Sequence, residues 1–164
     1  MSADLPISSP PTFDSNDIAH MRRALELAAH ARDTHEEVPV GAVLVRGGVI
    51  IGEGWNRSIT GNDATAHAEI VALRDAGARE GNYRLPGSML YVTLEPCVMC
   101  SGAIVHARVE RVVYAAADPK TGAAGSVFDT LVSPLHNHRV AVSGGLLGEE
   151  AGAMLREFFR QRRS

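Results

Sequence analysis

Two short motifs in this chain contain the residues that could hold a metal ion. His67 and Glu69 lie two residues apart, and Cys97 and Cys100 follow further along at positions i and i+3. These are the only two cysteines in the sequence. One imidazole and two thiolates are typical ligands of a catalytic zinc ion, which keeps three protein ligands and leaves a fourth position open for water. Glu69 is then free to move protons beside that open position.

Two other interpretations of the cysteine pair are weaker. A Cys-x-x-Cys pair alone is also typical of thioredoxin-like redox proteins. Such a pair needs no upstream His-Ala-Glu, and here Pro96 precedes the first cysteine instead of separating the two. A structural zinc site usually has four protein ligands. His136 and His138 could supply a fourth, but they lie far along the chain, and we interpret them as surface or substrate-loop residues.

Hydrophobic periodicity predicts a chain in which strands alternate with helices. Gly47-Gly48 is a two-residue hairpin signal between the first two strands. Ser15 or Asn16 is the predicted N-cap of the first helix and Thr65 that of the second. The predicted helices cover residues 16–33, 65–76, 96–106 and 147–161, the strands cover 40–46, 49–55, 89–93, 111–116 and 139–143, and a helical turn covers 127–131. This order predicts an α/β sandwich with a mostly parallel sheet beyond the hairpin.

Both motifs are predicted to lie where a strand leads into a helix. In open α/β sheets such junctions gather at one edge, where sites form. The partial positive charge of a helix N-terminus favours thiolate over thiol at Cys97 and Cys100. Residues two apart on a helix do not share a face, so His67 and Glu69 can approach one metal only at the helix end. This favours Glu69 as a group beside the zinc water rather than as a fourth ligand.

Length and composition are those of an ordinary globular protein. The chain has 164 residues, of which 45% are hydrophobic and 21% charged. No run of eighteen or more apolar residues exists, so we expect no membrane span. Residues 1–14 are rich in proline and serine and lack the features of a signal peptide, so we expect a disordered extension before a single domain at 15–164. Two cysteines with none to spare do not suggest a secreted disulfide scaffold, and we expect a cytoplasmic protein.

The charge distribution bears on a nucleic-acid partner. The net charge of −3 argues weakly against one. The last nine residues, however, contain four arginines against Glu157 alone, namely Arg156, Arg160, Arg162 and Arg163. Such a basic end can contact phosphates while the whole chain stays acidic. Composition alone favours the plainer alternative, a solvated helix end whose cations suit the C-terminal dipole.

The two motifs and several further segments resemble one family. His-x-Glu followed by Pro-Cys-x-x-Cys is the pattern of zinc-dependent deaminases. From about residue 16 to residue 163 the chain resembles bacterial tRNA-specific adenosine deaminases, in loop motifs as well as in zinc motifs. The matching segments are Val38-Pro-Val-Gly-Ala-Val-Leu-Val, Gly52-Glu-Gly-Trp-Asn-Arg, Thr65-Ala-His-Ala-Glu-Ile, Tyr91-Val-Thr-Leu-Glu-Pro-Cys-Val-Met-Cys, Asp118-Pro-Lys-Thr-Gly-Ala-Ala-Gly-Ser and Asn137-His-Arg-Val.

The resemblance implies a fold, a cofactor and a reaction. It implies the cytidine-deaminase-like fold, a three-layer α/β/α sandwich around a mixed five-stranded sheet, and a homodimer. It implies Zn²⁺ held by His67, Cys97 and Cys100, with Glu69 as the catalytic proton carrier. The implied reaction converts the wobble adenosine of a tRNA anticodon, chiefly of arginine tRNA, to inosine and releases ammonia. A base inside a stack cannot reach the metal, so the nucleotide of the anticodon stem-loop must be splayed out.

Other substrate-binding positions carry over by motif. Asn56 resembles the asparagine that hydrogen-bonds the bound nucleotide, although a turn-forming role after a strand is the alternative. The backbone N–H of Ala68 is expected to contact the base, because a helix N-terminus leaves donors free. We interpret Phe158 as core and Glu95 as structural or next to the metal ligands. Val38, Val40 and Leu94 resemble the apolar wall of the base pocket, with core packing nearly as favoured, while Asp118, Lys120, Phe159, Arg162 and Arg163 resemble RNA contacts.

The sequence departs from the family pattern in four features, and it leaves two rival functions to consider. The N-terminus is longer than in the familiar bacterial form, the chain stops soon after Arg163, Ala64 stands where proline is common, and the first helix lacks an expected aromatic pair. These differences bear on RNA affinity and leave the zinc site untouched. The nearest alternative is a deaminase of a free base or nucleoside such as guanine or cytosine. A non-catalytic RNA-binding subunit with a structural zinc would have no need of Glu69.

Overall fold

The computed structural model describes residues 11–163, and its helices and strands follow one another in the predicted order. Strand boundaries agree with the prediction to within two residues at each end. The elements are α1 (Ser15–His35), β1 (Gly41–Arg46), β2 (Val49–Trp55), α2 (Ala68–Glu80), β3 (Met89–Leu94), α3 (Val98–His106), β4 (Arg111–Ala116), β5 (Ala141–Gly144) and α4 (Gly148–Arg162). The predicted helical turn over 127–131 is wrong, because these residues form a bend and an irregular stretch that lead into a turn at 130–131.

The strands form one mixed sheet in the order β2-β1-β3-β4-β5. Strand β1 is antiparallel to both β2 and β3, whereas β3, β4 and β5 run parallel. Helix α2 connects β2 to β3 by a crossover, so β3 runs parallel to β2. Strand β1 lies between these two strands and is antiparallel to both. Parallel pairing therefore begins at β3 and not directly after the hairpin. The mixed five-stranded α/β architecture is confirmed.

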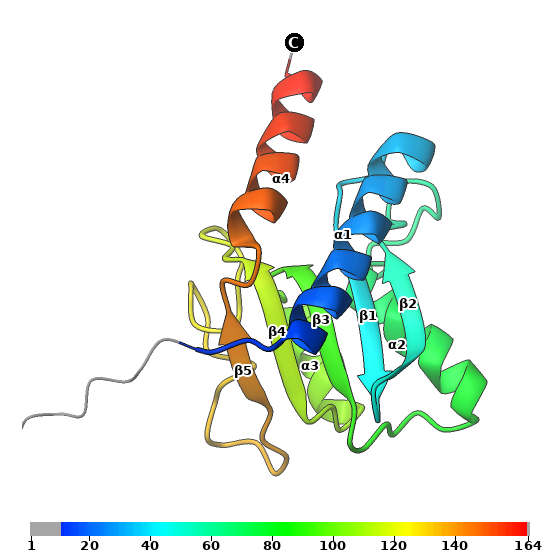
Figure 1. The fold of residues 1–164 in the computed structure, drawn as a ribbon, viewed down its shortest axis with the longest axis vertical. Coiled ribbons are helices and arrows are strands. Elements are labelled where there is room, and N and C mark those ends of the chain that lie inside the picture. The colour runs from blue at the N-terminus through cyan, green and yellow to red at the C-terminus, as the bar shows by residue number, and fades with distance from the viewer. Residues whose placement is uncertain (1–10, 164) are drawn as a thin grey trace, which may run out of the picture.

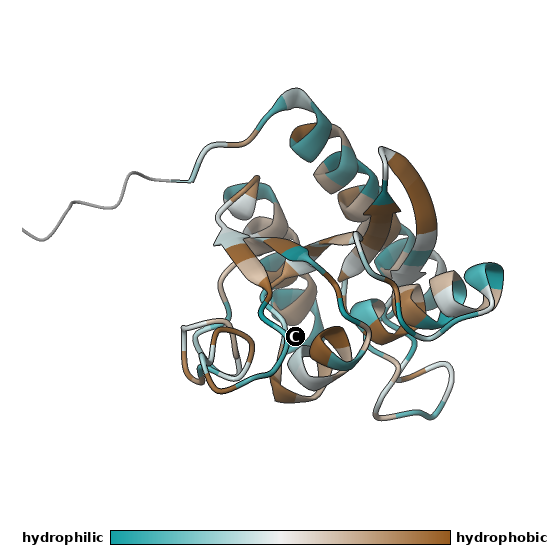
Figure 2. Cartoon of the chain, turned by 90° about the horizontal axis from the view of Figure 1, so that it is seen from below, coloured by the Kyte–Doolittle hydropathy of each residue, from teal (hydrophilic) through white to brown (hydrophobic). Residues whose placement is uncertain are grey.

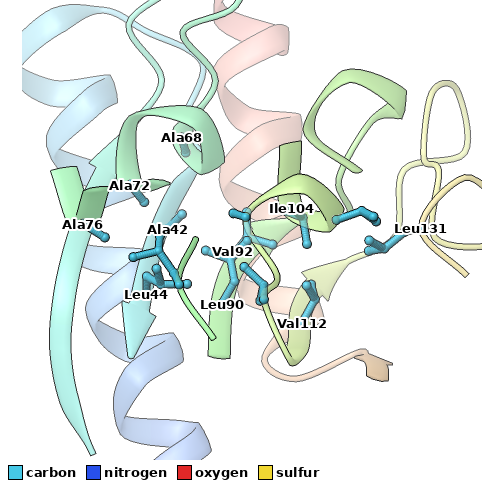
Figure 3. Close-up of a cluster of buried hydrophobic side chains, with 14 of the residues drawn as sticks. Ala42, Leu44, Ala68, Ala72, Ala76, Leu90, Val92, Ile104, Val112 and Leu131 are labelled. Atoms are coloured by element: carbon cyan, nitrogen blue, oxygen red, sulfur yellow. The ribbon is translucent and has the colours of Figure 1, made fainter. Parts of the chain in front are cut away.

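Helices cover both faces of the sheet, which gives the three predicted layers. Helices α1 and α4 lie on one face and α2 and α3 on the other (Figure 1). Successive strand residues point to opposite faces, so Leu44 and Val92 join the core under α2 and α3 (Figure 3), while Val43 and Tyr91 join the core under α1 and α4. Hydrophobic residues are accordingly concentrated on the strands between the helical layers (Figure 2).

The helix starts differ from the predicted ones for local reasons. Helix α1 begins with a capping box in which Asp14 and Asp17 each accept a hydrogen bond from the backbone of the other. Helix α2 begins at Ala68, three residues after the predicted cap Thr65, whose hydroxyl donates to Asp63 instead. His67 is extended, and α2 then continues from Ala68 to a left-handed cap at Gly81. The late start of α2 places His67 at the helix end.

A buried carboxylate fastens α1 to the sheet. Asp17 accepts a hydrogen bond of 2.6 Å from the Tyr91 hydroxyl and one of 2.9 Å from the Arg111 guanidinium. Burial by itself raises the pKa of Asp17, but the hydrogen bonds to Arg111 and Tyr91 together outweigh it and hold the pKa below its usual 3.8. Asp17 is therefore charged at neutral pH and links the helix to β3 and β4.

The described chain already contacts the core before α1 begins. Phe13 packs against the core that α1 and α4 cover, and Asp14 caps α1. The prediction of a disordered segment over residues 1–14 otherwise lies outside the described residues. No described helix combines the length and the hydropathy needed to cross a membrane.

Candidate active site

The three predicted metal ligands lie together. The Nδ1 atom of His67 is 3.6 Å from the Sγ atom of Cys97 and 3.6 Å from that of Cys100. Both cysteines are free thiols, and the three ligand atoms all lie within 4.8 Å of one another. Nitrogen and sulfur ligands of one tetrahedral zinc ion lie about 3.6 Å apart, given Zn–N and Zn–S distances of about 2.1 and 2.3 Å. The donor set and its spacing therefore fit zinc.

The sheet brings these ligands to one edge. Gly41 of β1 pairs with Trp55 of β2, and the next residue of β1 pairs with Val92 of β3, so β2 and β3 end at the same edge. Beyond that edge the chain reaches His67, the N-cap of α2, and Cys97, the N-cap of α3. Neither side chain makes a capping hydrogen bond, so both are available to a metal at the positive ends of the two helices.

Small residues let α2 lie close enough to place its first turn there. The α2 face toward the sheet consists of Ala68, Ala72 and Ala76 (Figure 3). Across from them, a Cβ atom added to Gly54 would lie 2.5 Å from the Ala68 carbonyl oxygen, and one added to Gly52 would lie 2.5 Å from that of Ala72. Glycine in β2 thus allows a helix-to-strand contact that a larger residue would block.

Close contact among the three side chains shifts their pKa values in different directions. The hydrogen bond from Cys100, with help from His67, lowers the pKa of the Cys97 thiol to about 4. Cys100 donates that bond and is buried, so its pKa is raised. The Cys97 sulfur also raises the pKa of His67. A bound divalent cation would reverse the direction at Cys100, because the ligand form of a cysteine is the thiolate.

Glu69 lies beside the cluster and is buried. Burial raises the pKa of the Glu69 carboxyl above its ordinary value. The raised pKa brings the carboxyl closer to the range in which it can both accept and release a proton near neutral pH. Glu69 stands outside the group of three ligands, as predicted.

A cavity of about 140 Å³ opens beside the metal ligands. Most of the residues predicted to bind the base line it, together with Glu69 and two of the ligands. Two lining residues, Glu95 and Thr121, were not among the predicted site residues. The lining residues are Val38, Val40, Asn56, His67, Glu69, Leu94, Glu95, Cys97, Asp118 and Thr121. Val38, Val40 and Leu94 also pack against the core, so the packing interpretation holds beside the pocket interpretation.

Asn56 is fixed to the start of α2. Its Oδ1 atom accepts a hydrogen bond of 2.8 Å from the backbone N–H of Ala68, and its own N–H donates to the Val40 carbonyl. The side-chain amide nitrogen of Asn56 remains a donor suited to a ligand in the cavity. The N–H group of Ala68, which was predicted to contact the base, therefore donates its hydrogen bond to the Asn56 side chain in this structure. A direct contact between Ala68 and the base stays a prediction.

The other predicted RNA contacts lie outside the cavity, apart from Asp118. The Asp118 carboxylate accepts hydrogen bonds from the backbone of Lys120 and from the Thr121 hydroxyl, so it also stabilises its own turn. In α4, Phe158 is buried as predicted and Phe159 is 47% exposed. The Arg162 guanidinium donates to the Glu36 carbonyl and lies 4.7 Å from the Phe158 ring, whereas Arg163 is exposed.

His136 and His138 belong to the loop between β4 and β5 and not to the cluster of His67, Cys97 and Cys100. The His136 Nε2 atom lies 2.5 Å from the Thr130 carbonyl oxygen, and the His138 Nε2 atom lies 2.7 Å from the Val109 carbonyl oxygen. Both histidines therefore hold the segment between β4 and β5 in place. The substrate-loop role considered for them remains a prediction.

The fold and this cluster together define the class of zinc-dependent deaminases. Residues 14–116 match the family model of the cytidine and deoxycytidylate deaminase zinc-binding region. The tRNA-specific adenosine deaminase of Haemophilus influenzae is 54% identical over 144 residues, which are 87% of this chain and 83% of the relative. The relative of the same name from Bacillus subtilis is 44% identical over 149 residues, 91% of this chain and 92% of that one.

The solved structures that are similar to this chain include deaminases as well. A structure from a study of A-to-I editing by tRNA:A34 deaminases at the wobble position of transfer RNA matches with a TM-score of 0.80 and 45% identity, covering 84% of this chain and 99% of that one. The guanine deaminase of Nitrosomonas europaea matches with a TM-score of 0.76 and 29% identity, covering 92% and 88%. The chain belongs to the cytidine and deoxycytidylate deaminase family, and within it to the tRNA-specific adenosine deaminases.

Proposed function

We propose that this enzyme hydrolyses the wobble adenosine of a tRNA anticodon, chiefly that of arginine tRNA, to inosine and ammonia with Zn²⁺ as cofactor. The observation that carries the proposal is the small cavity that joins Glu69 and the metal ligands to Asn56. Its volume suits one flipped base and excludes a stacked strand, so the nucleotide must leave its stack to react. The substrates named for the relatives support adenosine in tRNA over other bases.

The residues of the cavity divide the chemistry among them. When bound, zinc supplies a Lewis acid that makes water a nucleophile near neutral pH. Water adds its oxygen to C6 of adenine, and the amino group leaves as ammonia. Glu69 takes a proton from the water and delivers protons to the ring nitrogen and to the departing amine. Asn56 orients the base through its amide, with the Ala68 N–H as a further donor, and Val38, Val40 and Leu94 exclude bulk water.

Contacts outside the cavity hold the rest of the anticodon stem-loop. Asp118 and Lys120 belong to the loop at the mouth of the cavity, where a polar backbone and a cation suit the nucleotides next to the target. Phe159 offers an exposed aromatic face on α4, and Arg162 and Arg163 add positive charge. Aromatic stacking and cationic side chains are the usual means of binding unstacked RNA bases and backbone.

The assembly that we propose is a homodimer of a single deaminase domain at 15–164, with residues 1–14 as an extension, acting in the cytoplasm where tRNA is used. A second copy would cover the face formed by α2, α3 and the loop after β4. That loop exposes Val127, Phe128, Val132 and Leu135, of which Leu135 is 92% exposed. A groove of about 540 Å³ runs along α2 and α3, with Leu73, Tyr83 and Ala103 among its lining residues. Exposed apolar patches of this kind mark protein interfaces.

Solution mass tests the dimer directly. Sedimentation equilibrium should give twice the chain mass of 17.5 kDa, and Leu135→Asp combined with Phe128→Asp should shift the protein to monomer. A wild-type protein that stays monomeric at micromolar concentration would contradict the proposal.

An anticodon stem-loop assay tests the reaction. Purified protein is incubated with a stem-loop that bears a wobble adenosine, and inosine is measured after nuclease digestion, with arginine and other anticodons compared. We expect inosine and ammonia in equal amounts, chiefly from the arginine stem-loop. Free guanine and free cytosine are the rival substrates, in view of the guanine deaminase among the similar structures. Rapid ammonia release from free guanine with no inosine from RNA would move the assignment to a free-base deaminase.

A further inference from the structure

Two buried glutamates outside the metal cluster bind the loops that form the walls of the cavity. Glu37 and Glu95 are 1% and 2% exposed, and each accepts hydrogen bonds from the backbone of a loop that is neither helix nor strand. We propose that both are positioning residues for the substrate base, acting through these loops. The proposal rests on the proposed function for its substrate and adds two residues to which that function assigns no role.

Glu37 holds the loop that begins with Asn56. Its carboxylate accepts hydrogen bonds from the backbone N–H groups of Ile59 and Thr60, at 3.3 and 2.6 Å, and from the Thr60 hydroxyl at 3.0 Å. Glu37 is also followed directly by Val38, which lines the cavity. One side chain thus ties the apolar wall to the loop whose first residue, Asn56, lines the cavity.

Glu95 holds the second loop in the same way. Its carboxylate accepts hydrogen bonds from the N–H groups of Asp118, Ala124 and Ser126, at 3.0, 2.9 and 3.2 Å, and from the Ser126 hydroxyl. The loop wraps the carboxylate so closely that a Cβ atom added to Gly122 would lie 2.5 Å from Glu95. The loop brings Asp118 and Thr121 into the cavity wall, next to the metal ligand Cys97.

Carboxylates suit these two places because each glutamate and the loop around it stabilise each other. A buried carboxylate is costly unless hydrogen-bond donors surround it, and the N–H groups of an irregular loop are costly unless acceptors reach them. Each glutamate satisfies the loop donors, and the loop in turn stabilises the charge. The loops therefore have one favoured arrangement before substrate arrives, and the ordering cost of binding is lowered.

A double-mutant cycle tests the role of Glu37. Glu37→Gln keeps the size of the side chain but replaces one acceptor oxygen with a donor that faces an N–H group. We expect about a tenfold loss in kcat/KM, mainly through KM, which is the factor for one charge-assisted hydrogen bond. If Glu37 acts through the loop, the same change in an Asn56→Ala background should cost little more. Glu36→Gln makes the same chemical change at an exposed neighbour and should leave kcat/KM unchanged.

Amide hydrogen exchange gives a readout that does not depend on the reaction. Glu37→Gln should raise exchange at the Ile59 and Thr60 amides at least tenfold and leave the Ala124 amide protected, whereas Glu95→Gln should do the reverse. Zinc content should stay at the wild-type level in both variants. The proposal is overturned if exchange is unchanged in the loop that the substituted glutamate binds. It is also overturned if Glu37→Gln lowers kcat/KM equally in the wild-type and Asn56→Ala backgrounds. If the wild type deaminates no RNA, the proposed function fails, and the exchange pattern alone decides whether the glutamates hold the loops.

Discussion

Replacing Gly54 with alanine tests how closely α2 must approach the sheet to place the metal site. The added Cβ atom would lie 2.5 Å from both the Ala68 carbonyl oxygen and the Ala72 nitrogen, and ordinary contact begins at 3.4 Å. The first turn of α2 must therefore retreat by about 0.9 Å to relieve the overlap. Overpacking of this kind costs about 1–3 kcal/mol of stability. His67 caps this turn, so the same retreat moves a metal ligand away from the two cysteines.

The functional loss should exceed what the stability loss explains. Misplacing reacting groups by about 1 Å can cost about 100-fold in rate. We therefore expect Gly54→Ala to bind zinc more weakly in competition with a chromophoric chelator, and to lose about 100-fold in kcat/KM under conditions in which urea unfolding shows the variant to be folded. The three measurements separate loss of fold from displacement of the ligand.

Two further glycine-to-alanine variants are matched controls. Gly52→Ala makes a clash of the same 2.5 Å, but against Ala72, one turn further from His67. It should lose about 1–3 kcal/mol of stability and much less zinc affinity. Gly102→Ala meets no atom within 4 Å and lies in α3, so it should gain about 0.5–1 kcal/mol. Equal zinc affinity in Gly54→Ala and Gly52→Ala would refute the idea that close packing at Gly54 positions the ligand.

Four other substitutions separate catalysis, folding and RNA binding. Glu69→Ala should keep its zinc by elemental analysis and lose at least about 100–10,000-fold in kcat; a fully active variant would contradict the proton-transfer role. The lowered pKa of Asp17 means that its contribution to stability is complete above about pH 4 and is lost as the pH falls through that lowered pKa. Asp17→Asn should therefore be about 3 kcal/mol less stable at neutral pH and lose less than the wild type in urea titrations between about pH 4 and pH 2; parallel pH profiles would count against this. Arg162→Ala should lower both thermal stability and stem-loop affinity, because Arg162 covers Phe158. Arg163→Ala should lower only stem-loop affinity and should reduce the slope of log affinity against log salt by about 1. An equal loss of stability in both variants would refute this difference in role.

The sequence was most informative where structure depends on neighbours along the chain. Two short apolar segments and the Gly47-Gly48 pair between them predicted the β1–β2 hairpin, because residue type and turn conformation are local properties. The cluster of His67, Cys97 and Cys100 was predicted for a similar reason, since these residues stand in motifs whose residue types and spacing suit few chemistries other than zinc. Thr65 shows the limit of local reasoning. It is a good N-cap, yet the helix starts later, where the imidazole can reach the sulfurs of α3.

The residues that the sequence did not single out depend on partners that are distant along the chain. Glu37 looks like an ordinary charged residue at a helix end, and only folding buries it against the amides of Ile59 and Thr60. Glycines in β2 look like weak strand positions until α2 is packed onto them. Residue types and short spacings thus determined the family, the order of elements and the choice of His67, Cys97 and Cys100 as a cluster. The tertiary structure alone decided which loops wall the cavity and what holds them, because backbone amides are the same in every residue and their partners are chosen only when the chain is folded.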